Sequence, residues 1–332
     1  MNLFYDDIIY SLQQNGGITT YWKNITENAE IMDTFCVSRN NCVTSNSGIL
    51  LRQLLKLEKV ALPKNFDGIF HSSYYRLPNV SCRTVVTVHD FIYEYFSSGM
   101  TRKLNTFHIS RAIRKADAII CVSDATRLDL MKFIPGINED KINIVHHGVD
   151  HSIFNRDLEL NKRNIKDMAL FVGARQGYKN FVTAVLAIAN LKCARLGIIG
   201  PPLNSQERVI LVKNKVNFVE YGRVSTPKLA SLYRNAGCLI YPSLYEGFGI
   251  PILEAMATGL PVVISDNAAS KEVASGHAFI GSGQDVNSYI SAVDRAFNMS
   301  AELRDLAAAH AKKFTWTAAA AALANVYRSL EN

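Results

Sequence analysis

Short runs of apolar residues, each followed by a stretch with helical spacing, recur through most of the 332-residue chain. The runs are continuously apolar, which is the pattern of parallel strands buried on both faces of a sheet. Such strands are expected at residues 3–5, 68–71, 83–88, 118–122, 142–146, 169–172, 195–199, 216–219, 238–241 and 261–264. The pattern predicts an α/β fold.

A polar, charged stretch at residues 155–166 divides the chain into two halves of ordinary domain size. We predict an N-terminal domain over residues 1–154, a linker, and a second domain over residues 167–314. The alanine-rich residues 315–332 should form a C-terminal helix, which could pack back on the N-terminal domain. Two doubly wound, Rossmann-like domains facing a cleft would place ligands at the carboxyl ends of their strands.

Composition narrows the class of protein. The six cysteines form no C-x-x-C pair, which argues against a disulfide framework or a zinc site and fits a reducing cytosol. The first residues lack the basic and apolar regions of a signal peptide, so we expect a cytoplasmic protein. The net charge of +7 suits anionic partners such as nucleotide phosphates or lipid headgroups. It is too mild and too unclustered to indicate a nucleic-acid partner.

The most informative segment is YPSLYEGFGIPILEAMATGLPVV at residues 241–263. A strand is expected to end near its start, and its proline at position 251 suits the first turn of a helix. The N–H groups around Gly249 and Ile250 would then face an anion, and Gly247 and Gly249 would let a diphosphate approach the backbone. Glu246 and Glu254 flank this position, where sugar hydroxyls are the obvious donors to their carboxylates. The alternative is an ordinary strand–loop–helix unit with surface carboxylates.

In this context the Glu246-x7-Glu254 spacing resembles the signature of family four of the retaining GT-B glycosyltransferases. The resemblance implies that Glu246 contacts the transferred sugar and Glu254 the nucleotide ribose. It implies that the intervening loop, which includes Phe248, binds the donor. It covers about residues 2–328 and looks most like bacterial mannosyltransferase-type members that build O-antigen chains.

A second segment, FVGARQGYKN at residues 171–180, ends the first expected strand of the second domain. Arg175 offers a planar fork for phosphate oxygens and Lys179 a compact positive charge. In the family, such residues neutralise the leaving diphosphate. The spacing is one residue shorter than in the commonest family form and matches a subgroup with Arg-x-x-Tyr-Lys-Asn. The alternative is a solvated loop with two cations.

Three weaker segments resemble further family positions. Gly16 and Gly17 follow the first strand, where the family brings backbone N–H groups to the donor phosphates. His89 ends a strand, where the family places a histidine near the donor sugar. Tyr221 and Val224 belong to a segment whose backbone reads the base in the family. Each has an ordinary structural alternative, such as a turn or a buried core histidine.

The resemblance implies transfer of a hexose, with retention, from a nucleotide-diphosphate sugar to a saccharide or lipid-linked saccharide in O-antigen or capsule synthesis. Mannose from GDP-mannose is the leading donor. UDP- or dTDP-sugars (rhamnose, galactose or N-acetylhexosamine) remain alternatives, as does a non-catalytic nucleotide-sugar-binding partner subunit. No G-x-G-x-x-G follows a strand, which argues against a nicotinamide-dependent dehydrogenase.

No cofactor or metal is expected, because no Asp-x-Asp motif follows a strand in a metal-binding context. Residues 49–62 and 102–115 are basic and rich in helix formers. Either could lie on the cytoplasmic face of the inner membrane, where a lipid-linked acceptor would make such contact useful. For residues 49–62, a core helix with a solvated basic face is favoured.

Overall fold

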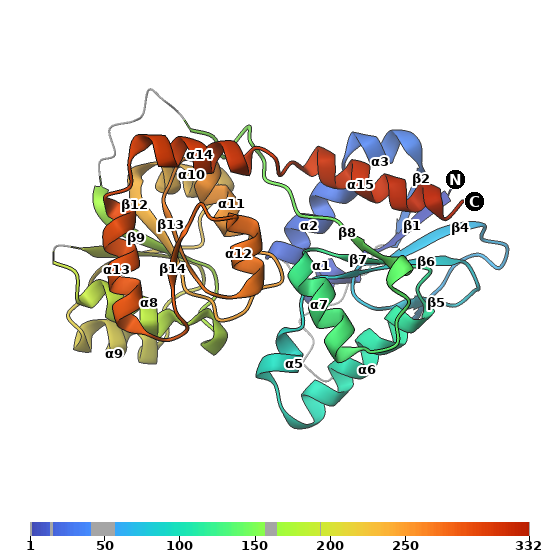
Figure 1. Cartoon of the computed structure of the whole chain (residues 1–332). Helices are drawn as coiled ribbons and strands as arrows, with labels where there is room; N and C mark the ends of the chain where they lie inside the picture. The colour runs from blue at the N-terminus through green and yellow to red at the C-terminus, as the bar shows by residue number, and fades with distance from the viewer. Residues whose placement is uncertain (1, 14–15, 41–56, 157–164, 193, 332) are drawn as a thin grey trace. The chain divides into compact units, whose positions relative to one another are not determined.

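The computed structural model describes residues 2–13, 16–40, 57–156, 165–192 and 194–331. The chain forms two compact units, of which the first combines Met1–Gly148 with Trp316–Asn332 and the second is Val149–Thr315 (Figure 1). The first unit ends at Gly148, before the predicted boundary at residue 154. The chain joins the second unit there because Val149 forms a β-bridge with Thr315 and donates its N–H to the Phe314 carbonyl at 3.1 Å. Most of the expected linker, residues 157–164, lies outside the described residues.

The first unit contains a six-stranded parallel sheet in the order β2-β1-β4-β6-β7-β8. Its strands are β1 (Asn2–Asp6), β2 (Cys36–Asn40), β4 (Gly68–Ser72), β6 (Arg83–Val88), β7 (Ala118–Cys121) and β8 (Ile142–Ile144). Two further short strands, β3 (Lys59–Val60) and β5 (Leu77–Pro78), pair with each other. Every residue of β4 and β7 is buried, which is the parallel, doubly covered arrangement that the apolar runs predict.

The helices of the first unit follow these strands. They are α1 (Ile8–Leu12), α2 (Gly17–Thr26), α3 (Ala29–Thr34), α5 (Ile92–Phe96), α6 (Gly99–Lys115), α7 (Asp124–Phe133), the 3₁₀ turn η1 (Glu139–Lys141), and α15 (Trp316–Ser329). Residues 49–56 of the expected helix at 49–62 lie outside the described residues. Its end is not helical, because Lys59 and Val60 form β3. No helix in the described part of the chain is long and apolar enough to cross a bilayer.

The C-terminal helix α15 packs on α2 and α3 of the first unit (Figure 1). Its buried side chains follow the spacing of one broad helix face: Trp316, Ala319, Ala320, Leu323, Ala324, Val326 and Tyr327. The small alanines let the helix approach closely. The Tyr327 hydroxyl lies 2.5 Å from Nδ1 of buried His71 and 3.1 Å from the Tyr5 hydroxyl. These bonds tie the end of the chain to β1 and β4.

The second unit has its own parallel sheet, in the order β11-β10-β9-β12-β13-β14. The strands are β9 (Ile165–Val172), β10 (Arg195–Ile199), β11 (Asn217–Gly222), β12 (Ala236–Tyr241), β13 (Val262–Ser265) and β14 (Phe279–Gly281). When these six strands are numbered from 1 in chain order, their order in the sheet is 3-2-1-4-5-6, which is that of the doubly wound Rossmann fold.

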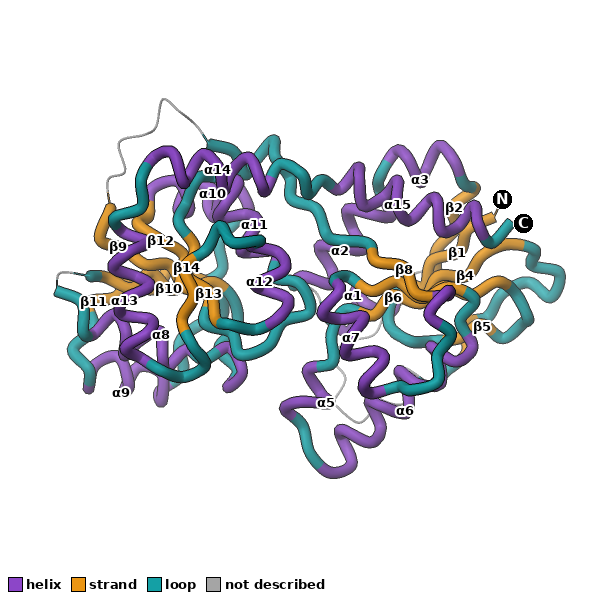
Figure 2. The backbone as a smooth tube through the Cα atoms, in the orientation of Figure 1, coloured by secondary structure: helices purple, strands orange, loops and turns teal. Residues whose placement is uncertain are grey.

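Helices cover both faces of this sheet (Figure 2). They are η2 (Gly177–Lys179), α8 (Phe181–Ala189), α9 (Ser205–Lys213), α10 (Thr226–Asn235), α11 (Ile250–Ala257), α12 (Ala268–Ala274), α13 (Val286–Phe297) and α14 (Ala301–Ala311). One core joins α8, α9 and α13 to alternate residues of the strands, such as Ala169 and Phe171 on β9. The other residues of β9, such as Leu170, are also buried. The sheet is therefore apolar on both faces, and polar chemistry is confined to its edges and loops.

Candidate active site

The strand order of the second unit singles out one position at the carboxyl edge of the sheet. After β9 the chain moves outward through β10 and β11, and then returns to place β12 on the other side of β9. The loops after β9 and β12 therefore leave the edge in opposite directions, and open α/β sheets bind ligands at such a switch point. The two loops are joined there, because the Leu244 N–H donates to the Tyr178 carbonyl at 2.8 Å.

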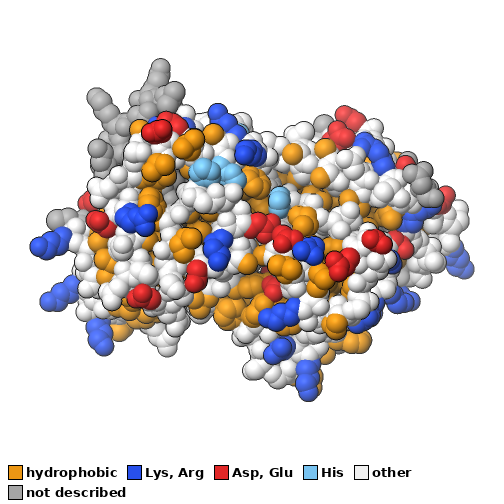
Figure 3. Space-filling model, in the orientation of Figure 1, with side chains coloured by type: hydrophobic (Ala, Val, Ile, Leu, Met, Phe, Trp, Pro, Cys, Tyr) orange, Lys and Arg blue, Asp and Glu red, His pale blue; other side chains and the backbone are white. Residues whose placement is uncertain are grey.

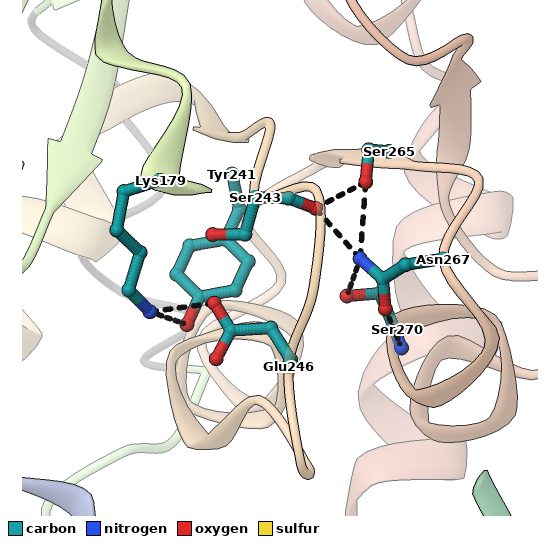
Figure 4. Close-up of polar contacts among 7 residues, drawn as sticks. All are labelled: Lys179, Tyr241, Ser243, Glu246, Ser265, Asn267 and Ser270. Atoms are coloured by element: carbon teal, nitrogen blue, oxygen red, sulfur yellow. Dashed lines mark hydrogen bonds and ion pairs between the residues drawn. The ribbon is translucent and has the colours of Figure 1, made fainter. Parts of the chain in front are cut away.

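Lys179 and Glu246 meet at this switch point (Figure 4). The Lys179 ammonium donates to Oε1 of Glu246 at 2.5 Å and to the Tyr241 hydroxyl at 3.2 Å. Its nitrogen also lies 5.3 Å from the Tyr178 ring centroid and 5.2 Å from that of Tyr241. The Lys179 and Glu246 side chains are only 15% and 10% exposed. A largely desolvated charge pair thus lies at the end of the sheet, with its cation close to two aromatic rings.

The loop that carries Glu246 is held by a separate set of hydrogen bonds (Figure 4). The Ser243 carbonyl accepts from the Ser265 hydroxyl and from Nδ2 of Asn267, the latter at 2.7 Å. Asn267 also caps α12 by accepting the Ser270 N–H at 2.9 Å. The sequence signal for Asn267 is that of an N-cap residue, and sequence reasoning does not single it out as a support for the site.

The start of α11 lies just beyond Glu246. Gly249 precedes the helix with φ of 110°, a left-handed conformation that favours glycine. No side chain caps this helix, and proline occupies a first-turn position where its missing N–H costs nothing. The N–H groups at the start of α11, including that of Ile250, therefore carry the partial positive charge of a helix N-terminus. The preceding Gly247 and Phe248 belong to the same loop, and the Phe248 ring packs 6.2 Å from that of Phe314.

Glu254 lies on α11 and accepts a hydrogen bond from the Tyr233 hydroxyl at 3.2 Å. Burial raises the pKa of Glu254 to about 7. Its carboxyl therefore exchanges its proton near neutral pH, and it can both donate to and accept from hydroxyl groups. Tyr233, on α10, is a neighbour that sequence reasoning missed, since nothing in the spacing between α10 and α11 indicates the contact.

The structure places Arg175 away from the Lys179–Glu246 pair. Nη2 of Arg175 donates to the carbonyls of Pro201 and Pro202 at 2.7 and 2.8 Å, and Nε lies 2.9 Å from Oε1 of Glu207. The arginine side chain is 3% exposed. Its fork is thus directed to the loop after β10 and to the start of α9, whereas the sequence prediction assigns it to a diphosphate.

Tyr221 and Val224 lie at the outer end of the same sheet. Tyr221 is the second-last residue of β11, and its hydroxyl donates to the Met168 sulfur at 3.5 Å. Val224 follows shortly after and is half-buried. Neither makes a hydrogen bond to Lys179, Glu246 or Glu254 in the described part of the chain, so the structure does not bring them into direct contact with the pair.

The remaining predicted residues belong to the first unit. His89 directly follows β6 and is 6% exposed, and its ring lies 5.1 Å from that of Tyr21. Neither of its ring nitrogens has a hydrogen-bond partner among the described residues. Burial lowers the pKa of His89 to about 3, so the imidazole is neutral at neutral pH. A buried, neutral imidazole with unpaired nitrogens is suited to a neutral ligand hydroxyl.

The glycine pair stands at the start of α2. Gly16 is the N-cap of this helix and Gly17 its first residue, with no side-chain cap. Gly16 has a φ of +157°, a backbone conformation that residues with a Cβ rarely adopt, so the position favours glycine. Residues 14 and 15 of the predicted loop lie outside the described residues. The described part leaves the N–H groups at the start of α2 without a side-chain acceptor.

Two protein families match the chain. The family Glycosyl transferases group 1 matches residues 155–314, and Glycosyltransferase Family 4 matches residues 22–153. The O-antigen chain mannosyltransferase RfbU of Salmonella typhimurium is 28% identical, over 67% of this chain and 63% of its own length. The O-antigen chain mannosyltransferase B of Escherichia coli is 26% identical, over 80% of this chain and 75% of its own length. The chain thus spans less than two thirds of the Salmonella protein.

Solved structures of the same fold cover nearly the whole chain. Sucrose-phosphate synthase of Thermosynechococcus elongatus has a TM-score of 0.78 at 16% identity, over 99% of both chains. Anabaena HepE, in complex with UDP and glucose, has a TM-score of 0.71 at 14% identity, over 99% of this chain and 100% of its own. At such low identity these similarities establish the fold, which is the GT-B fold with two Rossmann-like units.

Proposed function

Because this chain belongs to the group 1 glycosyltransferases, we propose that it transfers mannose from GDP-mannose, with retention of configuration, to a saccharide or lipid-linked saccharide. Two relatives named O-antigen chain mannosyltransferases support the sugar and the setting of bacterial surface polysaccharide synthesis. A UDP-sugar is the second candidate donor, because Anabaena HepE, of the same fold, holds UDP and glucose.

The observation that carries the proposal is the Lys179–Glu246 pair at the switch point, beside the uncapped start of α11. A cation and a helix N-terminus both attract a diphosphate. A carboxylate beside them repels phosphate but accepts hydrogen bonds from sugar hydroxyls. We therefore assign Lys179 and the N–H groups near Gly249 and Ile250 to the diphosphate, and Glu246 to the transferred sugar.

Glu254 is assigned to the nucleotide ribose in this scheme. It lies on α11, within the first turns after the assigned phosphate position. Its carboxyl already accepts one hydroxyl, that of Tyr233, and it retains an oxygen for a ribose hydroxyl. In the first unit, we assign the N–H groups near Gly16 and Gly17 to the donor phosphates and neutral His89 to a sugar hydroxyl. Backbone groups near Tyr221 and Val224 are assigned to the base.

The proposed transition state has C1–O cleavage ahead of attack by the acceptor. Negative charge then builds on the leaving diphosphate, and Lys179 and the start of α11 stabilise it more than they stabilise the bound donor. The departing phosphate oxygen accepts the acceptor proton. Arg175 adds positive charge near the end of β9. Nη1 of Arg175 has no hydrogen-bond partner among the described residues, so it is the nitrogen assigned to the diphosphate, while Nη2 keeps the carbonyls of Pro201 and Pro202.

Nucleotide binding and transfer can be tested separately. A thermal-shift series with GDP, UDP and dTDP should show stabilisation by GDP, of about 2.7 kcal/mol when the ligand is at about 100 times its dissociation constant. NMR of the product anomer then reports retention. Lys213, an exposed lysine on α9, provides a matched control: Lys213→Ala should leave turnover unchanged, whereas Lys179→Ala lowers it. Stabilisation by UDP alone would replace the GDP-mannose assignment, and stabilisation by none of the three would overturn the site.

A further inference from the structure

Lys179 is followed directly by a residue with left-handed backbone geometry. Asn180 has φ of 56° and ψ of 39°, and it stands between the 3₁₀ turn η2, which it caps, and helix α8, which starts at Phe181. Asparagine adopts this conformation more readily than most residues other than glycine. A right-handed residue at this position would let η2 run on into α8, so the left-handed turn sets the direction in which Lys179 leaves the backbone.

The side chain of Asn180 fixes this turn to a loop that is distant in the sequence. Its Nδ2 donates to the Gly283 carbonyl at 3.0 Å, and its Oδ1 accepts the Thr183 hydroxyl at 2.7 Å. Asn180 and Thr183 are only 5% and 4% exposed, so loss of either bond would leave a buried polar group unpaired. The usual role of an N-cap does not explain the residue, because its side chain accepts no N–H of α8.

The loop after β14, which receives this bond, is itself held in place. The Gly283 carbonyl also accepts from the Tyr289 hydroxyl at 3.3 Å, and the Gly283 N–H donates to Oδ1 of Asp266 at 3.4 Å. Asp266 directly follows β13 and precedes Asn267, which holds the loop of Glu246 (Figure 4). Two adjacent residues after β13 thus support both members of the charge pair, one through the loop after β12 and the other through the loop after β14.

Lys179 needs such support because it is a largely buried cation on a flexible side chain. The Lys and Arg side chains of the second unit that are visible in Figure 3 are spread over its surface among Asp and Glu residues, where water solvates them in many positions. Lys179 is only 15% exposed, and its ammonium lies 2.5 Å from Oε1 of Glu246 and 3.2 Å from the Tyr241 hydroxyl. A change in the direction of its backbone would break these contacts.

We propose that Asn180 is a positioning residue that aims the Lys179 ammonium at the leaving diphosphate. Asn180 acts through Lys179 rather than on the donor, because both ends of its amide already have partners in the protein. The assignment rests on the proposed function, in which Lys179 stabilises the charge that develops on the leaving group. A misplacement of about 1 Å at such a group costs up to about a hundredfold in rate, so loss of the amide should lower kcat.

Asn180→Gly tests the side-chain tie, because glycine keeps the left-handed backbone accessible and removes only the amide. We expect kcat and kcat/KM to fall together by about tenfold, with KM near that of the wild type. In the Lys179→Met background, Asn180→Gly should change kcat little, since it acts through the lysine. A wild-type kcat in Asn180→Gly, or the same tenfold loss in both backgrounds, would overturn the proposal.

A second cycle measures the positioning without any substrate. The coupling between Lys179 and Glu246 is obtained from urea unfolding of Lys179→Met, Glu246→Gln and the double variant. This coupling should be smaller when residue 180 is glycine than when it is asparagine, and an unchanged coupling would exclude the positioning role. If the wild type neither binds a nucleoside diphosphate nor consumes a donor, the proposed function fails, whereas this cycle still decides whether Asn180 aims Lys179.

Thr183 provides a milder variant in case Asn180→Gly does not fold. Thr183→Val removes the hydroxyl that Asn180 accepts with little change in shape, and it should lower kcat by a smaller factor than Asn180→Gly. Thr183→Ser keeps the hydroxyl and should keep the wild-type kcat. Equal kcat values in these two variants would refute the role of the amide.

The matched control is Asn190, at the opposite end of α8. Its Nδ2 donates to the Leu186 carbonyl at 2.8 Å, within the same helix. Asn190→Gly should therefore destabilise α8 without changing kcat. An equal loss of kcat in Asn190→Gly and Asn180→Gly would show that the stability of the helix, rather than the direction of Lys179, controls turnover, and the proposal would be wrong.

Discussion

Replacement of Lys179 by methionine tests whether the Lys179–Glu246 pair serves the fold or the reaction. The two charged atoms are 2.5 Å apart, and at an effective dielectric of about 20 such charges attract by about 6–7 kcal/mol. Desolvation of both groups offsets most of that attraction, so we expect a net coupling free energy of about 1–3 kcal/mol. Lys179→Met should therefore destabilise the protein, since it leaves Glu246 without its cation in a largely buried position.

The assay is a double-mutant cycle with Glu246→Gln, in which urea unfolding and turnover are measured for all four proteins. Lys179→Met with Glu246→Gln should recover most of the stability that Lys179→Met loses, because the unpaired carboxylate is gone. Turnover should not recover. It should remain about 10²–10³-fold below the wild type, as for the loss of one transition-state donor. Recovery of turnover together with stability would show that the pair only shapes the loop, and additive stabilities would refute the coupling.

Three further predictions follow from the same unit. The pKa of Glu254 is raised to about 7 in the folded protein, so the stability tied to its protonated form is complete below the pKa of the unfolded state and is lost as pH rises through 7. Glu254→Gln should therefore raise the free energy of unfolding by about 1–3 kcal/mol at about pH 8 and by little at about pH 5. An equal gain at both pH values, measured by urea unfolding, would contradict this. Asn267→Ala releases the Ser243 carbonyl and should lower kcat about tenfold. The control Asn28→Ala also removes an N-cap but should keep kcat, and equal kcat values would make Asn267 purely structural. Because no metal is proposed, dialysis against EDTA should leave turnover unchanged, whereas a loss restored by Mg²⁺ or Mn²⁺ would refute a metal-independent reaction.

The strands of both units could be predicted from the sequence because their apolar runs are continuous. Among the strands that the prediction missed, β2 lacks such a run, whereas β14 is a strand of only three residues at the edge of its sheet. Residues 36–40 read CVSRN, yet they form β2 because their backbone groups pair with β1, from Asn2↔Cys36 to Asp6↔Asn40. An edge strand needs only one neighbour and a partly apolar side, so its sequence carries a weak signal.

The site residues could be predicted one by one, but their partners could not. Glu246 and Lys179 each stand in a local motif, whereas their contact depends on the strand order that places β12 beside β9. The shifted pKa of Glu254 likewise depends on its burial beside Tyr233. Short-range spacing reports how a loop is built, and long-range packing decides which loops meet.

Arg175 shows what this distinction means for the mechanism. Lys179 and Arg175 follow the same strand, and residue type alone predicts that both bind the diphosphate. The structure separates them: Arg175 has two carbonyls and a carboxylate as partners, whereas Lys179 has one carboxylate and one phenol at the switch point. The Lys179 ammonium has three N–H donors and uses two of them in these bonds, so one remains for a phosphate at the start of α11 while Glu246 keeps its cation. We therefore expect the charge of the leaving group to fall first on Lys179 and the helix, with Arg175 holding the loop from which Lys179 acts.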